Sequence, residues 1–323
     1  MKIYRLRLLP RSAFLSPWQA DTIFGHLCWA IRHHEGEQAL LEFLEPFRES
    51  EPPLVLSNGF PADLLPRPLL PPPNPPAPGR PKMEQVEAMR RQKKMKGVEY
   101  FQLDEFNALC RGESPELVVQ QDNLWSETIL KNQINRVTGG TTGPDEDAGG
   151  NLYSVNEHRF IDRTSGALLP LALYIKVADD EWANRTLDLF ERVSLSGFGA
   201  KKSAGYGQFR VQDFESFDGF GQVPEANGFV SLSNFVPAPG NPDRGQYRTL
   251  VKYGKLGEEY ASSGRLSPFK FPILMLRAGS TFYTSEPREV YGQMVKGVHP
   301  EDESIVQYGY AFALPVKLAQ ANG

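Results

Sequence analysis

DDEWANRTLDLFERVSLSGFGAKKSAGYGQFRVQDF, residues 179–214, is the stretch that decides the fold. Over 179–193 the apolar residues recur at helical spacing, with acids at the start and Arg192 near the end, as the helix dipole favours. A glycine-rich loop follows at 197–207, and 207–214 alternates like a β-strand. The order is therefore helix, loop, strand. P-loops and dinucleotide fingerprints require strand, loop, helix, so the sequence argues against nucleotide hydrolysis and hydride transfer.

The loop itself, GFGAKKSAGYG, has the composition of a polyanion-binding segment. Its four glycines permit positive φ angles and a close approach of the backbone to a ligand. Lys201, Lys202 and Ser203 add cationic and hydroxyl donors, and no acidic residue lies between Arg192 and Arg210. We therefore expect this loop to contact a nucleic-acid backbone. The alternative is a flexible turn that only connects the helix to the strand.

Composition limits the classes of function. The 323 residues suggest about two domains, and a net charge of −4 argues against a protein that is basic all over. Basic residues gather in 1–33 and 82–96 and acidic ones in 35–51, which suits local RNA contact beside faces that meet proteins. Cys28 and Cys110 stand far apart and outside any metal-binding motif. Neither a zinc site nor a disulfide framework is predicted, and no cofactor or metal is expected.

The sequence carries no export or membrane signal. The N-terminal segment MKIYRLRLLP has arginines within its apolar run, unlike a signal peptide. No uninterrupted apolar stretch approaches the roughly 18 residues of a membrane span. We expect a cytoplasmic protein.

The first elements are a strand and a helix. Residues 2–9 alternate as a half-buried strand whose outer face carries Arg5 and Arg7. That face could meet solvent, another subunit or RNA. Ser16, followed by proline, is the expected N-cap of a helix that runs to about His34.

The stretch 52–150 interrupts this pattern. Residues 61–81 contain ten prolines, which favour irregular or polyproline-like structure. Residues 83–96 suit a short basic helix, and 138–150 a mobile loop. We interpret the whole stretch as a large insertion and not as a domain.

Regular structure returns with strands expected at 152–161 and 169–177. With the insertion removed, the order is β-α-β-β-α-β, the ferredoxin-like pattern shared by RNA-recognition modules. The predicted fold class is therefore α+β, with two ferredoxin-like (RRM-like) domains, 1–214 and 215–323. The second domain is a weaker match, because its helices are poorly marked. Its strands are expected at 229–236, at 269–277 and at the C-terminus.

Four segments resemble a known family. They are SPWQADTIFGHLCWA at 16–30, INRVTGGTTG at 134–143 followed by GGNLYSVNE, GFGAKKSAGYGQF at 197–209 and VQYGYAFALPV at 306–316. Together they are similar to the repeat-associated (RAMP) superfamily, and more narrowly to the fourth Csm subunit of type III-A CRISPR effector complexes. The glycine loop is typical of the whole superfamily. DTIFGHLCWA together with QYGYAFALPV is specific to this branch.

The resemblance implies a subunit that caps one end of a crRNA-bearing filament, beside the large polymerase/cyclase-like subunit and the Csm backbone subunit. It also implies binding of the 5′ handle of crRNA, without cleavage by the chain itself. The insertion would supply a hairpin that closes over the handle. By motif position, the RNA-binding residues would be Gly197, Phe198, Gly199, Lys201, Lys202, Ser203, Gly205, Tyr206, Asn135, Arg136, Ser16 and Trp18.

Alternatives stay open for residues and function alike. Tyr206 could stack on a base or pack beside the loop. His26 could be the general acid/base of a metal-independent endoribonuclease that processes precursor crRNA, as in some RAMP relatives, or a packed histidine. His33 and His34 have an ordinary role at the end of a helix. The chain could also be a structural adaptor that meets only proteins.

Overall fold

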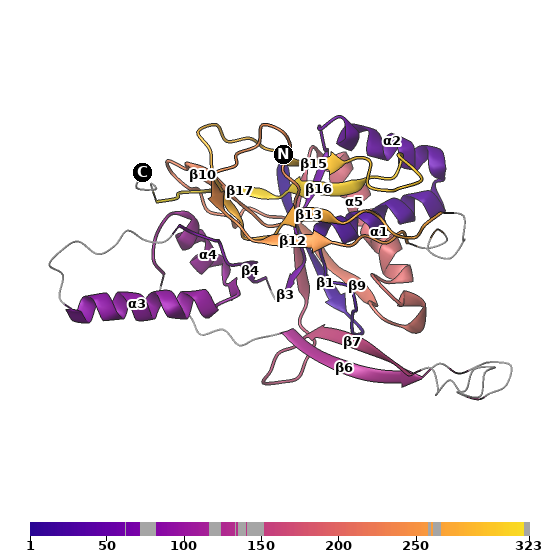
Figure 1. Ribbon diagram of the computed structural model, residues 1–323, viewed down its shortest axis with the longest axis horizontal. Coiled ribbons are helices and arrows are strands. Elements are labelled where there is room, and N and C mark those ends of the chain that lie inside the picture. Colours follow the sequence, from indigo (N-terminus) through magenta and orange to yellow (C-terminus); the bar gives the residue numbers. More distant parts are fainter. Residues whose placement is uncertain are drawn as a thin grey trace.

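The computed structural model describes residues 1–61, 63–71, 82–115, 124–132, 134, 140, 152–257, 260 and 266–319 (Figure 1). One sheet organises the N-terminal half. Its strands are β1 (Lys2–Pro10), β2 (Leu54–Leu56), β3 (Phe60–Pro61), β8 (Leu171–Val177) and β9 (Phe209–Ser216). β1 lies between β8 and β9, and β2 and β3 pair with the other edge of β8, always antiparallel.

Three helices accompany this sheet: α1 (Ala20–His34), α2 (Glu37–Arg48) and α5 (Asp180–Ser196). The expected helix at 179–193 is confirmed, and Asp179 is its N-cap, accepting a hydrogen bond from the Trp182 amide at 2.9 Å. The buried face of α5 contains Ala183, Thr186, Leu189, Phe190 and Val193. The chain order β1, α1, β2, β8, α5, β9 is β-α-β-β-α-β.

The second strand of that pattern is not the one expected. Leu54–Leu56 occupies the place in the sheet that the sequence analysis gave to 152–161. Residues Leu152–Phe160 do form a strand, β7, but it pairs with β6 (Leu124–Asn132) in a hairpin that projects from the body (Figure 1). β2 has only three residues, all fully buried, so it shows no alternation to detect. The insertion therefore begins after the sheet residues of β2 and β3, not at 52.

The rest of the insertion is only partly regular. The helix expected at 83–96 is confirmed as α3 (Lys82–Gly97). β4 (Leu65–Pro66) precedes α3 in the chain and pairs with β5 (Tyr100–Phe101), which follows it. α4 (Leu103–Cys110) comes next. Much of the proline-rich part, 72–81, and the expected loop 138–150, Gly140 apart, lie outside the described residues.

Three small antiparallel sheets form the C-terminal half. β11 (Gly245–Gln246), β14 (Thr281–Tyr283), β10 (Gly228–Ser231) and β17 (Ala313–Val316) follow one another in the first. β12 (Thr249–Lys252) pairs with β13 (Ile273–Leu276), and β15 (Tyr291–Val295) with β16 (Gln307–Ala311). The expected C-terminal strand is thus two strands in different sheets, separated at Phe312. In the part of this half that the structure describes there is no α-helix, so a second ferredoxin-like unit stays a prediction.

One apolar core joins the two halves. It includes Leu6, Leu27 and Phe47 from the first half and Tyr308 and Tyr310 from the second, all at most 2% exposed. The Tyr310 hydroxyl donates to the Phe47 carbonyl at 2.6 Å, and the Tyr308 hydroxyl accepts from the Leu56 amide at 3.0 Å. The core shows no gap between the two halves, so the domain boundary at 214/215 remains a prediction.

A buried ion pair also ties α1 to the C-terminal half. The Asp21 side chain is 1% exposed, and its Oδ2 lies 2.9 Å from Lys252 Nζ. Gln307 Nε2 donates to the same oxygen at 2.8 Å. Lys252 Nζ donates further to Gln19 Oε1 at 2.7 Å. Breaking such a pair from one side leaves an unpaired buried charge, which costs about 3–5 kcal/mol.

No helix in the described ranges is both long and apolar enough to cross a membrane.

Candidate RNA interface

The glycine loop has a defined backbone. Gly197, Gly199, Lys201, Gly205 and Gly207 all have positive φ, from +57° to +87°. The Phe198 amide donates to the Gly207 carbonyl at 2.9 Å, and the Gly207 amide to the Ala13 carbonyl at 2.7 Å. A Cβ at Gly207 would lie 1.8 Å from the Phe198 carbonyl oxygen. Only glycine fits at this position. The loop is therefore more than a flexible turn that joins the helix to the strand.

The loop is also fastened to the segment before α1. The Ala200 amide donates to Ser16 Oγ at 3.0 Å, and the Gly199 amide donates to His26 Nε2 at 2.9 Å. Ser16 is therefore not a helix cap. The helix begins at Ala20 with Gln19 as its N-cap, because the Ser16 hydroxyl is turned toward the glycine loop. The amides of Phe198, Gly199 and Ala200 bond within the protein, so these three are not donors to RNA in this conformation.

Trp18 and Phe198 anchor the loop from below. The two rings stack with centroids 3.9 Å apart, and Phe209 meets Trp18 edge-on at 5.3 Å. Trp18 is 5% exposed and Phe198 1%. In this conformation both aromatic rings are part of the core and neither presents a face to a base.

Tyr206 connects the loop to the β6–β7 hairpin. It is buried, and its hydroxyl donates to Glu157 of β7 and accepts from Lys131 of β6. Lys131 Nζ also lies 4.4 Å from the centre of the Tyr206 ring, and the hydrogen bond raises the pKa of Lys131. Glu157, itself buried, is paired with Arg159 at 3.0 Å. Sequence reasoning missed Lys131, Glu157 and Arg159, although their alternation along two paired strands was a usable signal.

We expect Tyr206→Phe to loosen this connection. Removing the hydroxyl takes away one hydrogen-bond partner of a buried carboxylate, which costs about 1–3 kcal/mol of unfolding free energy. Urea unfolding of the variant measures it. Thr128→Val, which removes an exposed hydrogen bond to Asn156 farther along the same hairpin, is the matched control with a smaller loss. Equal losses in the two variants would contradict the connection.

The outer face of the loop is cationic. Lys201 and Ser203 are exposed, and Lys201 Nζ lies 3.8 Å from the centre of the Tyr153 ring on β7. Lys202 is half-buried and donates to Ser196 Oγ at 3.4 Å. Lys131 and Arg159 lie on the hairpin, where both pair with the buried Glu157. Asn135 and Arg136 follow β6 in the chain but lie outside the described residues.

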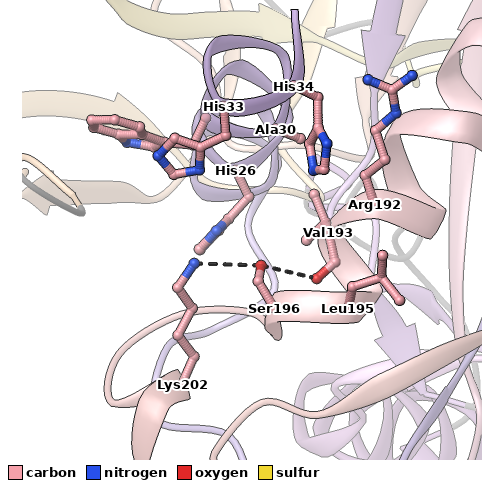
Figure 2. A pocket seen from close by; sticks show the side chains of 10 residues that line it. His26, Ala30, His33, His34, Arg192, Val193, Leu195, Ser196 and Lys202 are labelled. Carbon is pink, nitrogen blue, oxygen red and sulfur yellow. Dashed lines mark hydrogen bonds between the residues drawn. The ribbon is translucent and has the colours of Figure 1, made fainter.

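His26 faces both the loop and a small pocket (Figure 2). Its Nε2 accepts the Gly199 amide, and its ring centre is 4.9 Å from that of Phe198. An accepting Nε2 carries no proton, so the neutral ring holds its proton on Nδ1. Nε2 is therefore already occupied by the hydrogen bond from the Gly199 amide in this conformation.

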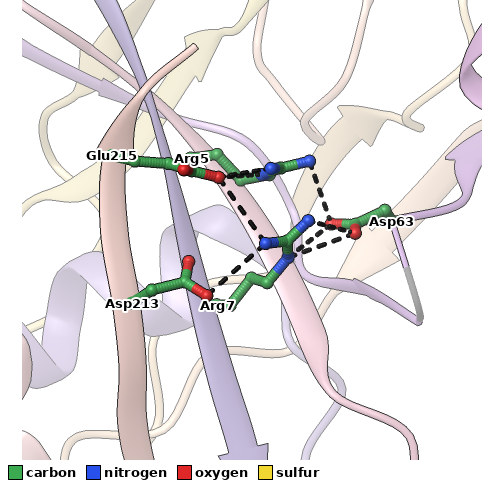
Figure 3. A network of polar contacts seen from close by, with 5 residues as sticks. All are labelled: Arg5, Arg7, Asp63, Asp213 and Glu215. Atoms are coloured by element: carbon green, nitrogen blue, oxygen red, sulfur yellow. Dashed lines mark hydrogen bonds and ion pairs between the residues drawn. The ribbon is translucent and has the colours of Figure 1, made fainter.

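Arg5 and Arg7 lie in a network of carboxylates (Figure 3). Arg7 is 2.7 Å from Asp63 and 3.4 Å from Asp213, and Arg5 pairs with Glu215. The hydrogen bond with Asp63 is the main cause that raises the pKa of Arg7. Two guanidinium groups thus face three carboxylates, and the outer face of β1 is not the basic surface that its sequence suggested.

The chain is similar to known proteins in sequence and in fold. No family model matches it. A curated Streptococcus thermophilus protein described as "CRISPR system Cms protein Csm4" is 29% identical over 164 residues. That alignment covers 49% of this chain and 44% of the relative, so the chain spans less than half the length of that protein.

Solved structures extend the likeness to nearly the whole chain. A chain of the Csm1–Csm4 cassette in complex with cA4 aligns with a TM-score of 0.62 and 18% identity, covering 99% of this chain and 100% of that one. A chain of the Csm3–Csm4 subcomplex of the type III-A CRISPR-Cas interference complex gives 0.60 and 13%, covering 98% and 100%. At these identities the likeness shows the fold. Together with the curated relative it confirms the resemblance seen in the sequence: the chain is similar to Csm4 in sequence over about half of its length and in fold over nearly all of it.

Proposed function

We propose that the chain is the non-catalytic, RNA-binding subunit of a type III-A CRISPR (Csm) effector complex and that it binds the 5′ handle of crRNA. One observation carries the proposal. A loop fixed by five residues of positive φ presents Lys201 and Lys202, and the hairpin beside it carries Lys131, which donates to the loop residue Tyr206. That the RNA is the 5′ handle of crRNA is what the resemblance to this branch of the RAMP superfamily implies.

Cationic side chains on a rigid loop suit the sugar-phosphate backbone and not a base sequence. Phosphate contacts position a nucleic acid, and each one that releases counterions makes the affinity depend on salt. The amides of Phe198, Gly199 and Ala200 are already bonded, so we assign the contacts of this loop to Lys201, Lys202 and Ser203. Asn135 and Arg136, which follow the hairpin strand β6, remain candidate contacts.

The proposal includes the assembly. Two neighbours, a large polymerase/cyclase-like subunit and a Csm backbone subunit, correspond to the Csm1 and Csm3 that accompany Csm4 in the similar structures. The chain would cap the filament between them, with 1–214 as a ferredoxin-like RAMP domain and 215–323 as a second domain of the same kind. Target cutting and cyclic-nucleotide synthesis would belong to other subunits.

The rival function is processing of precursor crRNA by His26. The Gly199 amide on His26 Nε2 favours a structural role, since that nitrogen would have to exchange its partner before it moved a proton. Incubation of the purified chain with a repeat RNA in EDTA tests it. Cleavage that disappears in His26→Ala would establish the rival.

We expect Lys201→Glu with Lys202→Glu to lower the crRNA retained by the assembled complex by about tenfold or more. Each reversal replaces an attraction of about 1 kcal/mol near a phosphate by a repulsion of similar size. The measurement is RNA recovered per complex after co-expression with a repeat–spacer array. Arg288→Glu with Lys296→Glu, two exposed cations flanking β15, makes the same charge change elsewhere and should retain the guide. Undiminished retention in the loop variant would sink the proposal.

A further inference from the structure

The pocket beside His26 lies between α1, the C-terminal end of α5 and the glycine loop (Figure 2). Its volume is about 170 Å³. None of the residues that line it, all within the described part of the chain, is a carboxylate. The polar side chains around it are those of His26, His33, His34, Arg192, Ser196 and Lys202.

Lys202 links this pocket to the glycine loop. Figure 2 shows its amine directed toward the His26 ring and Ser196. Lys202 Nζ donates to Ser196 Oγ at 3.4 Å, and Ser196 Oγ donates to the Val193 carbonyl at 3.3 Å. The backbone neighbours of Lys202 are Lys201 and Ser203, the exposed residues of the proposed RNA-binding face. Lys202 therefore joins the pocket to the residues of that face.

The fixed charges around the pocket nearly cancel. Arg192 pairs with Glu35 at 3.0 Å and with Asp188 at 2.7 Å, and Arg185 pairs with the same Glu35 at 2.9 Å. With Lys202 this makes three cations against two carboxylates, a single net positive charge. Arg32 of α1 pairs with Glu37 of α2, so these two charges cancel. Tyr260, whose ring lies beside that of Trp29, adds no charge.

Because the helix dipoles disfavour an anion here, the charge of the histidines decides whether the pocket attracts one. α1 and α5 both end at this pocket, and helix C-termini carry partial negative charge that disfavours an anion. Histidine is the side chain whose charge ordinarily changes between pH 5 and 8. Protonation of His33 and His34 would turn a weakly positive pocket into a more strongly positive one.

Size restricts the ligand. Pockets for molecules of drug size measure about 300–1,000 Å³. At about 170 Å³ this pocket is smaller and suits a compact group such as one phosphate better than a whole nucleotide.

We propose that this pocket binds one phosphate group of the RNA backbone and that its histidines strengthen this binding as the pH falls. The inference rests on the proposed function only in taking RNA as the source of the phosphate. Lys202 contributes the permanent charge, and His33 and His34, both exposed at the end of α1, contribute the charge that varies. His26 holds the loop in place and closes the inner side of the pocket.

The test compares the affinity of the full-length chain for a fluorescent 5′-hydroxyl oligoribonucleotide at pH 8 and pH 6. We expect binding about fivefold tighter at pH 6, since one added charge near a phosphate contributes about 1 kcal/mol. His33→Gln with His34→Gln should abolish this change. His33→Lys with His34→Lys should bind tightly at both values. Circular dichroism checks that α1 persists in each variant.

Two results would overturn the inference: an unchanged pH dependence in the Gln variant, or equally weak binding by the Lys variant. A chain that binds no RNA at either pH would instead defeat the proposed function. In that case inorganic phosphate is the probe, followed through the histidine side-chain signals in a ¹H–¹⁵N NMR titration at pH 6. Shifts confined to the pocket histidines would then support the pocket, and their absence would refute it.

Discussion

Gly207→Ala is expected to disrupt the glycine loop while the sheets beneath it remain folded. The new Cβ would stand 1.8 Å from the Phe198 carbonyl oxygen, and the residue would have to keep φ at +63°. A left-handed residue other than glycine costs about 1–2 kcal/mol. Displacing the packed backbone costs about 1–3 kcal/mol more, and the bond between the Phe198 amide and the Gly207 carbonyl about 1 kcal/mol. We expect an overall loss of about 3 kcal/mol or more.

The matched control is Gly205→Ala in the same loop. Gly205 also has positive φ, +87°, but a Cβ there meets nothing within 4 Å. Only the backbone term of about 1–2 kcal/mol applies. Urea unfolding of both variants, with RNA affinity measured alongside, separates close approach from φ alone. If the two variants lost equal stability, the contact between Gly207 and Phe198 would not be what fixes the loop.

Trp18→Ala is expected to destabilise the protein by about 3–5 kcal/mol, the usual cost of removing a large buried aromatic side chain. The indole lies between Phe198 of the loop and Phe209 at the start of β9, so its removal opens a cavity directly under the loop. RNA binding should weaken as a consequence, because Lys201 and Lys202 lose their fixed positions.

Trp18→Phe distinguishes packing from a direct role in RNA recognition. Trp18 Nε1 is buried and has no hydrogen-bond partner among the described residues, so exchanging indole for phenyl sacrifices no polar contact. We expect a loss of less than half that of Trp18→Ala, with RNA affinity nearly unchanged. A Phe variant that is as stable as the natural protein but fails to bind RNA would show that Trp18 contacts the ligand itself.

The strong periodic elements could be predicted from the sequence. α5 has an acidic start and a regular apolar face, and β1 alternates cleanly, so both were placed within a few residues. β2 could not be found, since three buried residues carry no period. The same limit explains why Leu152–Phe160 was assigned to the main sheet: its alternation is genuine, but it belongs to a hairpin whose partner lies in the insertion.

The candidate site was predictable by position but not by orientation. The glycine spacing and the two lysines correctly predicted a loop at 197–207 that carries cationic side chains. Nothing in the sequence says that Ser16 turns its hydroxyl to the Ala200 amide or that Phe198 faces inward onto Trp18. These choices follow from tertiary packing, in which a buried aromatic pair contributes more than an exposed ring.

The ion pair between Asp21 and Lys252 has a consequence for the proposed assembly. Separating the two halves would break this pair and expose the apolar core that they share, which opposes hinge motion between them. In the proposed complex, a neighbouring subunit that contacts the C-terminal strands would therefore also fix the angle at which Lys201 and Lys202 approach the RNA.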